Sequence, residues 1–372
     1  MSGTKKNPST ITSLLQQRID KGSLRSLISL YPKIDFSSND YLGFSSKGLL
    51  NEEIRKMDSS IKIGSTGSRL ISGNSNLFNE IENEIAKFHH SESALIYNSG
   101  YDANLGLLSS VPQKGDLILS DELIHASLID GIRLSFATHY KFKHNDVNSL
   151  KELLERHENT FNEIYIVVES VYSMDGDCAP LLDILKLCNK KNIHLIVDEA
   201  HAIGVFGEQG RGLCDELHIE KDCFARIYTF GKAMGCHGAA IVGSEELKKY
   251  LINFSRSFIY TTAMPEHSLL AIKSAYYLLI KTDEIDKLKS NISYFNSYIN
   301  NSYNFIKSES AIHCKLIFGN TQVQEAEMRL RHLDVFVKSI KSPTVKEGQE
   351  RLRICLHSFN SKQEIDLLLS SC

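Results

Sequence analysis

The 372-residue sequence lacks several features that would assign it to a specialised class of protein. Its eight cysteines include no C-x-x-C pair, so neither a zinc site nor a disulfide framework is indicated. Its formal net charge is only −3, without the basic excess typical of nucleic-acid binding. No apolar run approaches the roughly 18 residues that span a bilayer, and residues 1–10 have no apolar signal-peptide core. These absences predict a cytoplasmic protein that contacts neither nucleic acid nor membrane.

Motifs of several catalytic classes are also absent. There is no G-x-G-x-x-G after a strand, no G-x-S-x-G elbow and no H-E-x-x-H helix. Residues 198–201, Asp-Glu-Ala-His, resemble an ATPase acidic box, but the G-x-x-x-x-G-K-[ST] loop that should accompany it is missing. His89 and His90 stand near Glu92 at the end of a predicted helix, where a solvated helix terminus is a better interpretation than a metal site. We therefore expect no metal centre and no ATPase activity.

Apolar segments of strand length recur along the first two thirds of the chain. They cover 93–97, 116–119, 139–142, 164–169, 194–198, 225–229 and 239–243, with helical patterns between several of them at 103–109, 127–135, 147–157 and 181–191. Strands with little polar alternation that are separated by helices predict an α/β fold with a mainly parallel sheet covered by helices. Ligands of such sheets bind beyond the carboxyl ends of the strands. Glu169, Asp198 and Thr229 all fall at such ends.

The length and a change of pattern after Pro265 predict more than one domain. Long helical patterns at 266–280 and 285–306 precede short strands near 315–318 and 351–356 and a closing helix at 361–370. We expect a large ligand-binding domain at 46–265 and a smaller C-terminal α+β domain at 266–372.

Lys232 directly follows the apolar segment 225–229 and has the small neighbours Gly231 and Ala233. A lysine in such a place is poorly hydrated, so its pKa falls and its free amine can attack a carbonyl carbon. Taken alone, the segment is more often the start of a loop with a surface lysine. The remaining residues have to decide between the two interpretations.

Asp198 is the second informative residue. A carboxylate at the end of a buried strand is costly unless a cation or strong donors meet it. Asp198 could cap the following loop, or it could keep a pyridine nitrogen protonated, as pyridoxal phosphate requires of its enzymes. A carboxylate and a low-pKa lysine at successive strand ends are what that cofactor needs.

Gly100 follows the strand segment 93–97 and opens a helical segment, whose N-terminal N–H groups can bind a phosphate. Ser99 or Asp102 could equally serve as a simple helix cap. His125 follows another predicted strand, where an imidazole can stack on a flat ring, although a lone histidine there is usually structural. The presence of Lys232 and the other candidate residues in the same sequence favours the functional interpretation of His125.

Nine segments now carry a family resemblance. They are SSNDYLG (37–43), GSTGSRLISG (64–73), YNSGYDANLG (97–106), IHASLIDG (124–131), ESVYSMDGD (169–177), VDEAHAIGVFGEQGRG (197–212), TFGKAMGCHGAA (229–240), IYTTAMP (259–265) and RLRICLH (351–357). From about Phe36 to the C-terminus the chain resembles the α-oxoamine synthases, which are fold-type-I pyridoxal phosphate enzymes. The resemblance also implies that residues 1–45 contribute a helix and a strand that pack on the small domain.

The resemblance implies how the cofactor is held. Lys232 would bind it covalently and later move the substrate's α-proton, while Asp198 would pair with the pyridinium nitrogen and His125 would stack on the ring. The other cofactor ligands would be Ser173 and His201 on the phenolic oxygen, Gly100, Tyr101 and Thr229 on the phosphate, and Thr261 or Thr262 on the phosphate of a second subunit. The active site would therefore need a homodimer.

The resemblance also implies the substrates. Asn39 and Arg353 would hold an amino-acid carboxylate, a task that suits a guanidinium fork, and Glu169 and Arg69 would support the acyl donor. The amino acid, L-alanine, would condense with an acyl-CoA, pimeloyl-CoA, and release CoA and carbon dioxide. His201 would donate to the developing carbonyl oxygen.

Two departures from the family pattern fall near the expected acyl entrance. The stretch between Arg25 and Asp35 is short, and Lys341-Ser342 precede Pro343 where relatives carry Arg-Pro. Three alternatives therefore stay open: a glycine-using relative such as a glycine C-acetyltransferase, a CoA-independent aminotransferase, and a non-catalytic protein on the same fold. Retention of both Lys232 and Asp198 counts against the last.

Overall fold

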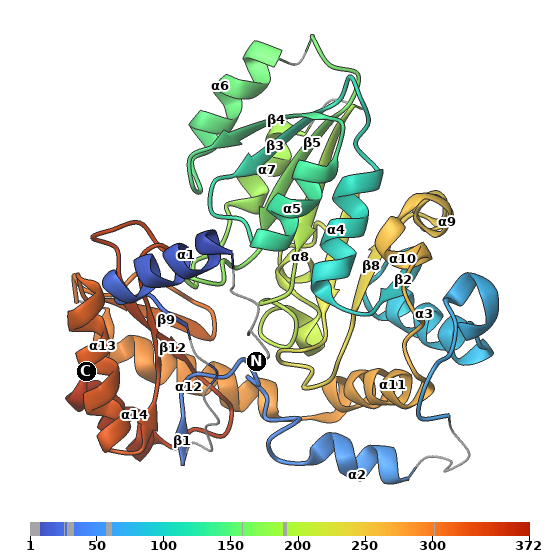
Figure 1. Cartoon of the computed structure of the whole chain (residues 1–372). Helices are drawn as coiled ribbons and strands as arrows, with labels where there is room; N and C mark the ends of the chain where they lie inside the picture. The colour runs from blue at the N-terminus through green and yellow to red at the C-terminus, as the bar shows by residue number, and fades with distance from the viewer. Residues whose placement is uncertain are drawn as a thin grey trace, which may run out of the picture.

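The computed structural model describes residues 8–25, 27, 33–56, 62–157, 159–188, 192–300 and 302–372. Two larger sheets and a two-stranded pair organise these residues (Figure 1). A seven-stranded sheet with its helices forms the larger part. A three-stranded sheet with α12 to α14 forms the smaller part, beside which α1 lies.

The large sheet has the strand order β2-β8-β7-β6-β5-β3-β4. Its strands are β2 (Ser93–Tyr97), β3 (Leu117–Asp121), β4 (Thr138–Phe142), β5 (Ile164–Glu169), β6 (Ile193–Asp198), β7 (Ala225–Thr229) and β8 (Ala239–Gly243). The five adjacent strands β7, β6, β5, β3 and β4 are parallel, which confirms the predicted mainly parallel sheet. Only β8 runs antiparallel to its neighbours β2 and β7, and the sequence pattern did not reveal this.

Helices cover the large sheet, because its inner strands are apolar on both faces. Every residue of β2, β3 and β5 is buried, whereas the edge strand β4 is largely accessible. The helices of this part are α3 (Asn76–Phe88), α4 (Gly100–Ser110), α5 (Ala126–Leu134), α6 (Val147–His157), α7 (Leu181–Leu187), α8 (Leu213–Glu216), α9 (Glu245–Phe254), α10 (Arg256–Ile259) and α11 (Glu266–Lys281). The predicted helix at 181–191 ends four residues early, and 189–191 lie outside the described residues.

The small sheet has the order β11-β12-β9 and is antiparallel. Its strands are β9 (Ile312–Leu316), β11 (Lys338–Ile340) and β12 (Arg351–Cys355), accompanied by α12 (Glu284–Ile299), α13 (Asn320–His332) and α14 (Lys362–Ser371). Two predictions were wrong in their bounds here: the helix at 285–306 ends at Ile299, and the strand at 315–318 begins earlier, at Ile312.

The N-terminal segment contributes α1 (Ser9–Asp20), β1 (Ile34–Asp35) and α2 (Leu49–Arg55). Strand β1 pairs in parallel with β10 (Val335–Phe336), and Asn320 Nδ2 in α13 donates to the Lys21 carbonyl at 3.2 Å. These contacts join residues of the predicted segment 1–45 to the C-terminal part, while the predicted domain boundaries themselves stay a prediction. Among the described residues, no helix has both the length and the apolar character needed to span a bilayer.

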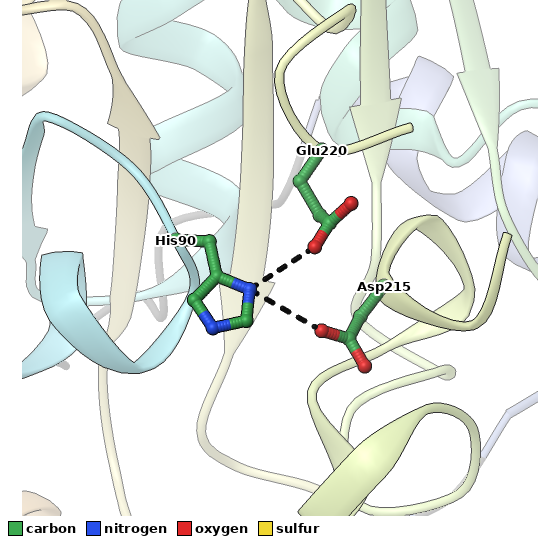
Figure 2. A group of neighbouring side chains, drawn as sticks. All are labelled: His90, Asp215 and Glu220. Carbon is green, nitrogen blue, oxygen red and sulfur yellow. Dashed lines mark hydrogen bonds and ion pairs between the residues drawn. The ribbon is translucent and has the colours of Figure 1, made fainter. Parts of the chain in front are cut away.

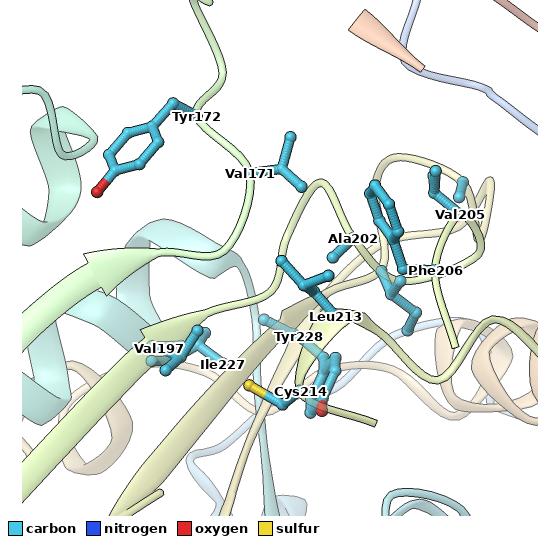
Figure 3. Close-up of a cluster of buried hydrophobic side chains, with 14 of the residues drawn as sticks. Val171, Tyr172, Val197, Ala202, Val205, Phe206, Leu213, Cys214, Ile227 and Tyr228 are labelled. Atoms are coloured by element: carbon cyan, nitrogen blue, oxygen red, sulfur yellow. The ribbon is translucent and has the colours of Figure 1, made fainter. Parts of the chain in front are cut away.

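A buried apolar cluster lies under the carboxyl ends of β6 and β7 (Figure 3). Val197 and Ile227 of these strands pack in the same cluster as Ala202 of the loop that follows β6 and Leu213 at the start of α8. Glu199 fixes the loop from within, because its fully buried carboxylate accepts the backbone N–H of Leu213 at 2.9 Å and that of Cys214 at 2.7 Å. This loop therefore forms a firm base for the residues above it.

Candidate active site

Adjacent strand ends bring the predicted acidic residues and the lysine together. Glu169 and Asp198 are direct partners in the pairing of β5 with β6, and Asp198 pairs with Ile227 of β7. Lys232 lies three residues beyond Thr229, the last residue of β7. The site therefore lies at the carboxyl end of the parallel strands, where sheets of this kind bind ligands.

Lys232 carries a perturbed amine. Burial lowers its pKa to about 8, although the charge of Asp198, and that of Glu169 when it is ionised, act in the opposite direction. The charge of Arg353 lowers the pKa further. Since the desolvation effect is the largest, a substantial fraction of this amine is neutral near physiological pH, as a nucleophilic lysine requires.

Glu169 is the second perturbed group. Burial raises its pKa to about 8, and the nearby charge of Asp198 raises it as well. The Glu169 Oε1 atom is buried and has no hydrogen-bond partner. A mostly protonated carboxyl group with a free oxygen faces Lys232 and Asp198, so Glu169 can donate or accept a hydrogen bond to a bound ligand.

Asp198 and His125 are joined by two residues that the sequence interpretation missed, Asn104 and Ser127. The Asn104 amide donates to Asp198 Oδ2 at 2.8 Å and to Ser127 Oγ at 3.0 Å. Ser127 Oγ lies 2.7 Å from His125 Nδ1, and the Ser127 backbone N–H donates to the same nitrogen at 3.2 Å. Asn104 is 2 % exposed in α4, between the buried residues Ala103 and Gly106. An asparagine at a buried helix position was the sequence feature that could have indicated a buried polar network.

A second network joins His201, Asn39 and Arg353 through the fully buried Tyr41. The Tyr41 hydroxyl lies 2.7 Å from His201 Nδ1 and 3.2 Å from Asn39 Oδ1. Arg353 donates from Nη2 to Asn39 Oδ1 at 2.9 Å. Burial, reinforced by the charge of Lys232, holds the His201 pKa well below its usual value, so this imidazole is neutral. Tyr41 was also missed, although it lies inside the SSNDYLG segment.

The predicted phosphate turn has the expected local geometry. Ser99 caps α4, because its Oγ accepts the Asp102 backbone N–H at 3.1 Å. A Cβ atom added to Gly100 would lie 2.3 Å from Thr229 Oγ1, so only glycine lets this helix N-terminus approach the end of β7. The Tyr101 side chain is exposed and its hydroxyl bonds Asp130, which leaves the backbone N–H as its contribution to the turn.

Other predicted residues have separate surroundings. Thr261 Oγ1 accepts from Asn98 Nδ2 at 3.0 Å, and the Thr262 carbonyl accepts from the same nitrogen at 2.9 Å. Arg69 is engaged by Glu82 and Asn74, so its guanidinium is already paired within the chain. The Ser173 carbonyl accepts from Arg353 Nε at 2.6 Å, which places Ser173 beside the predicted substrate residues.

His89 and His90 differ from the prediction of a shared solvated terminus. His89 is buried, stacks on Tyr228 with ring centroids 3.6 Å apart, and bonds the Tyr276 hydroxyl. His90 is exposed and points toward Glu220 and Asp215, as Figure 2 shows, with its Nδ1 3.1 Å and 3.6 Å from their carboxylate oxygens. This trio lines a cavity of about 1270 Å³ whose lining includes none of the predicted site residues.

Comparison with known proteins identifies the class. A family model described as "Aminotransferase class I and II" matches residues 31–371, and the chain belongs to that family. A solved serine palmitoyltransferase of Sphingomonas wittichii superposes with a TM-score of 0.89 at 25 % identity, covering 98 % of this chain and 96 % of the other. The fold is therefore that of a fold-type-I pyridoxal phosphate enzyme, as predicted.

Closer relatives in sequence define the type within that class. An 8-amino-7-oxononanoate synthase of Emericella nidulans is 38 % identical, covering 97 % of this chain and 94 % of its own. A putative 8-amino-7-oxononanoate synthase of Methanocaldococcus jannaschii is 40 % identical over 90 % of this chain and 89 % of its own. The solved 8-amino-7-oxononanoate synthase of Francisella tularensis is 32 % identical, with a TM-score of 0.78 and coverages of 91 % and 96 %. The protein is an enzyme of the α-oxoamine synthase type that uses pyridoxal 5′-phosphate.

The side chains of the site fit this cofactor. The close approach of Gly100 to Thr229 leaves a helix N-terminus free to receive a phosphate. Asp198 is 4 % exposed and oriented by Asn104, while the ring of His125 is accessible for stacking. With the Lys232 amine nearby, the chain supplies the anion site, the ring-nitrogen partner and the nucleophile that the cofactor requires.

We expect the apoprotein to capture pyridoxal 5′-phosphate at Lys232 faster as pH rises, with half of the increase reached near the lysine pKa of about 8, because only the neutral amine attacks a carbonyl. Stopped-flow absorbance measures the rate, and borohydride reduction followed by peptide mass spectrometry locates the label. Lys232→Ala should retain no cofactor after reduction. Lys248→Ala, which removes a cation paired with Glu82, serves as the matched control. A capture rate that is independent of pH between 6 and 9 would contradict the lowered pKa.

We expect Asn104→Ala to lower the free energy of unfolding by about 1–3 kcal/mol, because Asp198 and Ser127 lose a buried donor. The same variant should bind pyridoxal 5′-phosphate more weakly, since Asp198 and His125 are no longer held in a fixed relation. Urea denaturation and cofactor titration measure the two effects. Asn253→Ala, on an exposed face of α9, is the control and should change neither. Unchanged cofactor affinity in Asn104→Ala would show that the network does not position the cofactor residues.

Proposed function

We propose that the enzyme condenses an amino acid with an acyl-CoA and releases CoA and carbon dioxide. The observation that carries the proposal is the low-pKa amine of Lys232 at a strand end adjacent to the buried carboxylate of Asp198. The sequence relatives named 8-amino-7-oxononanoate synthase support L-alanine and pimeloyl-CoA as the substrates. A glycine-using relative is the alternative, because Lys341-Ser342 depart from the family pattern.

The proposed chemistry divides between the cofactor and the chain. When bound, pyridoxal 5′-phosphate supplies a protonated ring that accepts the electron pair left when the α-proton departs. Lys232, whose pKa of about 8 leaves part of its amine neutral near physiological pH, removes that proton and later returns one to the product. Asp198 would face the ring nitrogen, and Asn104 holds its Oδ2 atom in place. His125 covers one face of the ring.

The network around Tyr41 binds the amino-acid substrate in this proposal. Arg353 and Asn39 bind the amino-acid carboxylate, and the guanidinium fork gives this contact its direction. When the Tyr41 hydroxyl donates to His201 Nδ1, the proton of the neutral ring is on Nε2, which then donates to the cofactor's phenolic oxygen or to the developing carbonyl oxygen. Ser173 assists at the phenolic oxygen. Glu169, protonated below its pKa of about 8, can donate to the acyl carbonyl without bringing a second negative charge beside Asp198.

We expect CoA thiol to be released only when both an amino acid and an acyl-CoA are present. A thiol-reactive dye follows the release in a matrix of amino acids against acyl-CoA chain lengths, and carbon dioxide is measured in parallel. L-Alanine with pimeloyl-CoA should give the largest kcat/KM. Faster turnover of glycine with acetyl-CoA would overturn the substrate assignment, whereas amino transfer to a keto acid without CoA would overturn the reaction class.

We also propose a homodimer in which Thr261 or Thr262 reaches the phosphate of the second subunit. Large apolar side chains on the surface support an association, since Ile71 is 85 % exposed and Phe136 is 80 % exposed. Light scattering coupled to gel filtration should give twice the mass of one chain. A monomeric mass together with full activity would contradict a shared active site.

A further inference from the structure

The residues that follow β5 form a small hairpin between the two sheets. Val171 and Cys178 form an antiparallel bridge, and the Tyr172 backbone N–H donates to the Asp177 carbonyl at 3.0 Å. The turn of the hairpin contains Ser173, Met174, Asp175 and Gly176.

The small sheet holds one side of the hairpin. Arg353 Nε in β12 donates to the Ser173 carbonyl at 2.6 Å, and Arg351 in the same strand pairs with Asp175. The hydroxyls of Ser308 and Ser310 both donate to the Gly176 carbonyl, at 2.8 Å and 2.7 Å. The position of the Arg353 guanidinium is therefore tied directly to the position of this turn.

His144 holds the other side. Its Nε2 lies 2.8 Å from Asp177 Oδ2 in the hairpin, and its Nδ1 lies 3.0 Å from Asp121 Oδ1 at the end of β3. The neighbouring Asn145 repeats both contacts, with its backbone N–H on Asp121 at 2.8 Å and its amide on Asp177 at 2.7 Å. The ring edge of Tyr172 closes the arrangement, with centroids 4.5 Å apart.

We propose that His144 is a positioning residue for amino-acid binding, because it anchors the hairpin 171–178 to the large sheet and thereby sets the place of Arg353. The proposal rests on the proposed function of Arg353 as the carboxylate ligand. An imidazole bonded to a carboxylate through each nitrogen acts as a rigid cationic bridge, since both nitrogens donate only when the ring is protonated. Without this bridge, the Asn145 contacts with Asp121 and Asp177 would be the side-chain link left on the side of the large sheet, and they carry no positive charge.

The charges around the ring favour its protonated form. The charged groups packed against it are Asp121 at the end of β3, Glu122 directly after it, and Asp175 and Asp177 in the hairpin. Arg351 is paired to Asp175 and Lys346 to Glu122. The His144 pKa is raised to about 9: burial lowers it, and the hydrogen bonds to Asp121 and Asp177 outweigh that effect. Because the folded-state pKa lies above the unfolded one, the bridge contributes fully below pH 6.5 and is lost as pH rises through about 9.

The test compares His144→Gln with His194→Gln in the complete enzyme. His194 is a matched control, since its Nε2 pairs with Glu163 at 2.7 Å, its side chain is 23 % exposed against 21 % for His144, and it lies at the start of β6, away from the site. Binding of L-alanine to the cofactor-loaded protein is followed by absorbance, without any acyl-CoA. We expect His144→Gln to weaken this binding about tenfold, the effect of one lost charge-assisted hydrogen bond. The KM for the acyl-CoA should change less than about twofold.

Two further measurements identify the cause. Hydrogen exchange should become faster in residues 171–178 of His144→Gln, while residues 193–198 stay unchanged. The ratio of variant to wild-type dissociation constants should fall towards one between pH 7 and pH 10, because the wild-type ring loses its proton. If His144→Gln does not fold, Asp177→Asn removes the same contact from the hairpin side and should give the same result.

The outcomes separate this proposal from the proposed function. Unchanged hydrogen exchange and unchanged amino-acid affinity in His144→Gln would overturn the anchoring role. Faster exchange in 171–178 with unchanged affinity would also overturn it, because the hairpin would then not set the place of Arg353. If the wild-type enzyme itself binds no amino acid, the proposed function fails, and faster exchange would still establish the anchor.

Discussion

The candidate site depends on two groups of opposite charge, Asp198 and Lys232, that are shielded from water at the ends of adjacent strands. An isolated buried ion costs several kcal/mol, so Asp198 and Lys232 are tolerated only because their surroundings compensate them. Asp198 accepts the Asn104 amide at 2.8 Å and the Ala200 backbone N–H at 3.0 Å. The loss of hydration of the Lys232 ammonium is compensated less completely. Burial lowers its pKa even though the carboxyl groups of Asp198 and Glu169 act to raise it. The incomplete compensation of the lysine keeps part of its amine neutral near physiological pH.

Rigid supports keep these charges in place. Below the strand ends, the apolar cluster and the buried Glu199 fix the loop that carries His201. On the side of the small sheet, Tyr41 and Arg353 bring Asn39 and His201 into one network. Both parts of the chain therefore contribute polar groups to a single hydrogen-bonded network.

Much of the large sheet could be predicted from sequence, because its strands are apolar on both faces. The bounds of β2, β5, β7 and β8 agree with the predicted segments, whereas the antiparallel direction of β8 could not be predicted, since an apolar run carries no sign of its direction. In the candidate site, the sequence predicted that Asp198 ends a strand and that Lys232 follows one, and the structure confirms both positions. Asn104, Tyr41 and His144 were not, because their roles arise from contacts across more than 90 residues or from a hairpin whose place only the fold defines.

The end of β6 has a consequence for how the sequence can vary. Asp198 and Glu199 are neighbours in the chain, yet one carboxylate meets Asn104 above the sheet end and the other is enclosed by backbone N–H groups of the loop. Successive side chains of a strand point to opposite faces, so a shift of one residue would exchange the two carboxylates. The longer one would then lie beside Asn104, and the shorter one could not reach the backbone N–H groups that now donate to Glu199. Strand alignment at this point is thus as much a determinant of the chemistry as the identity of either acid.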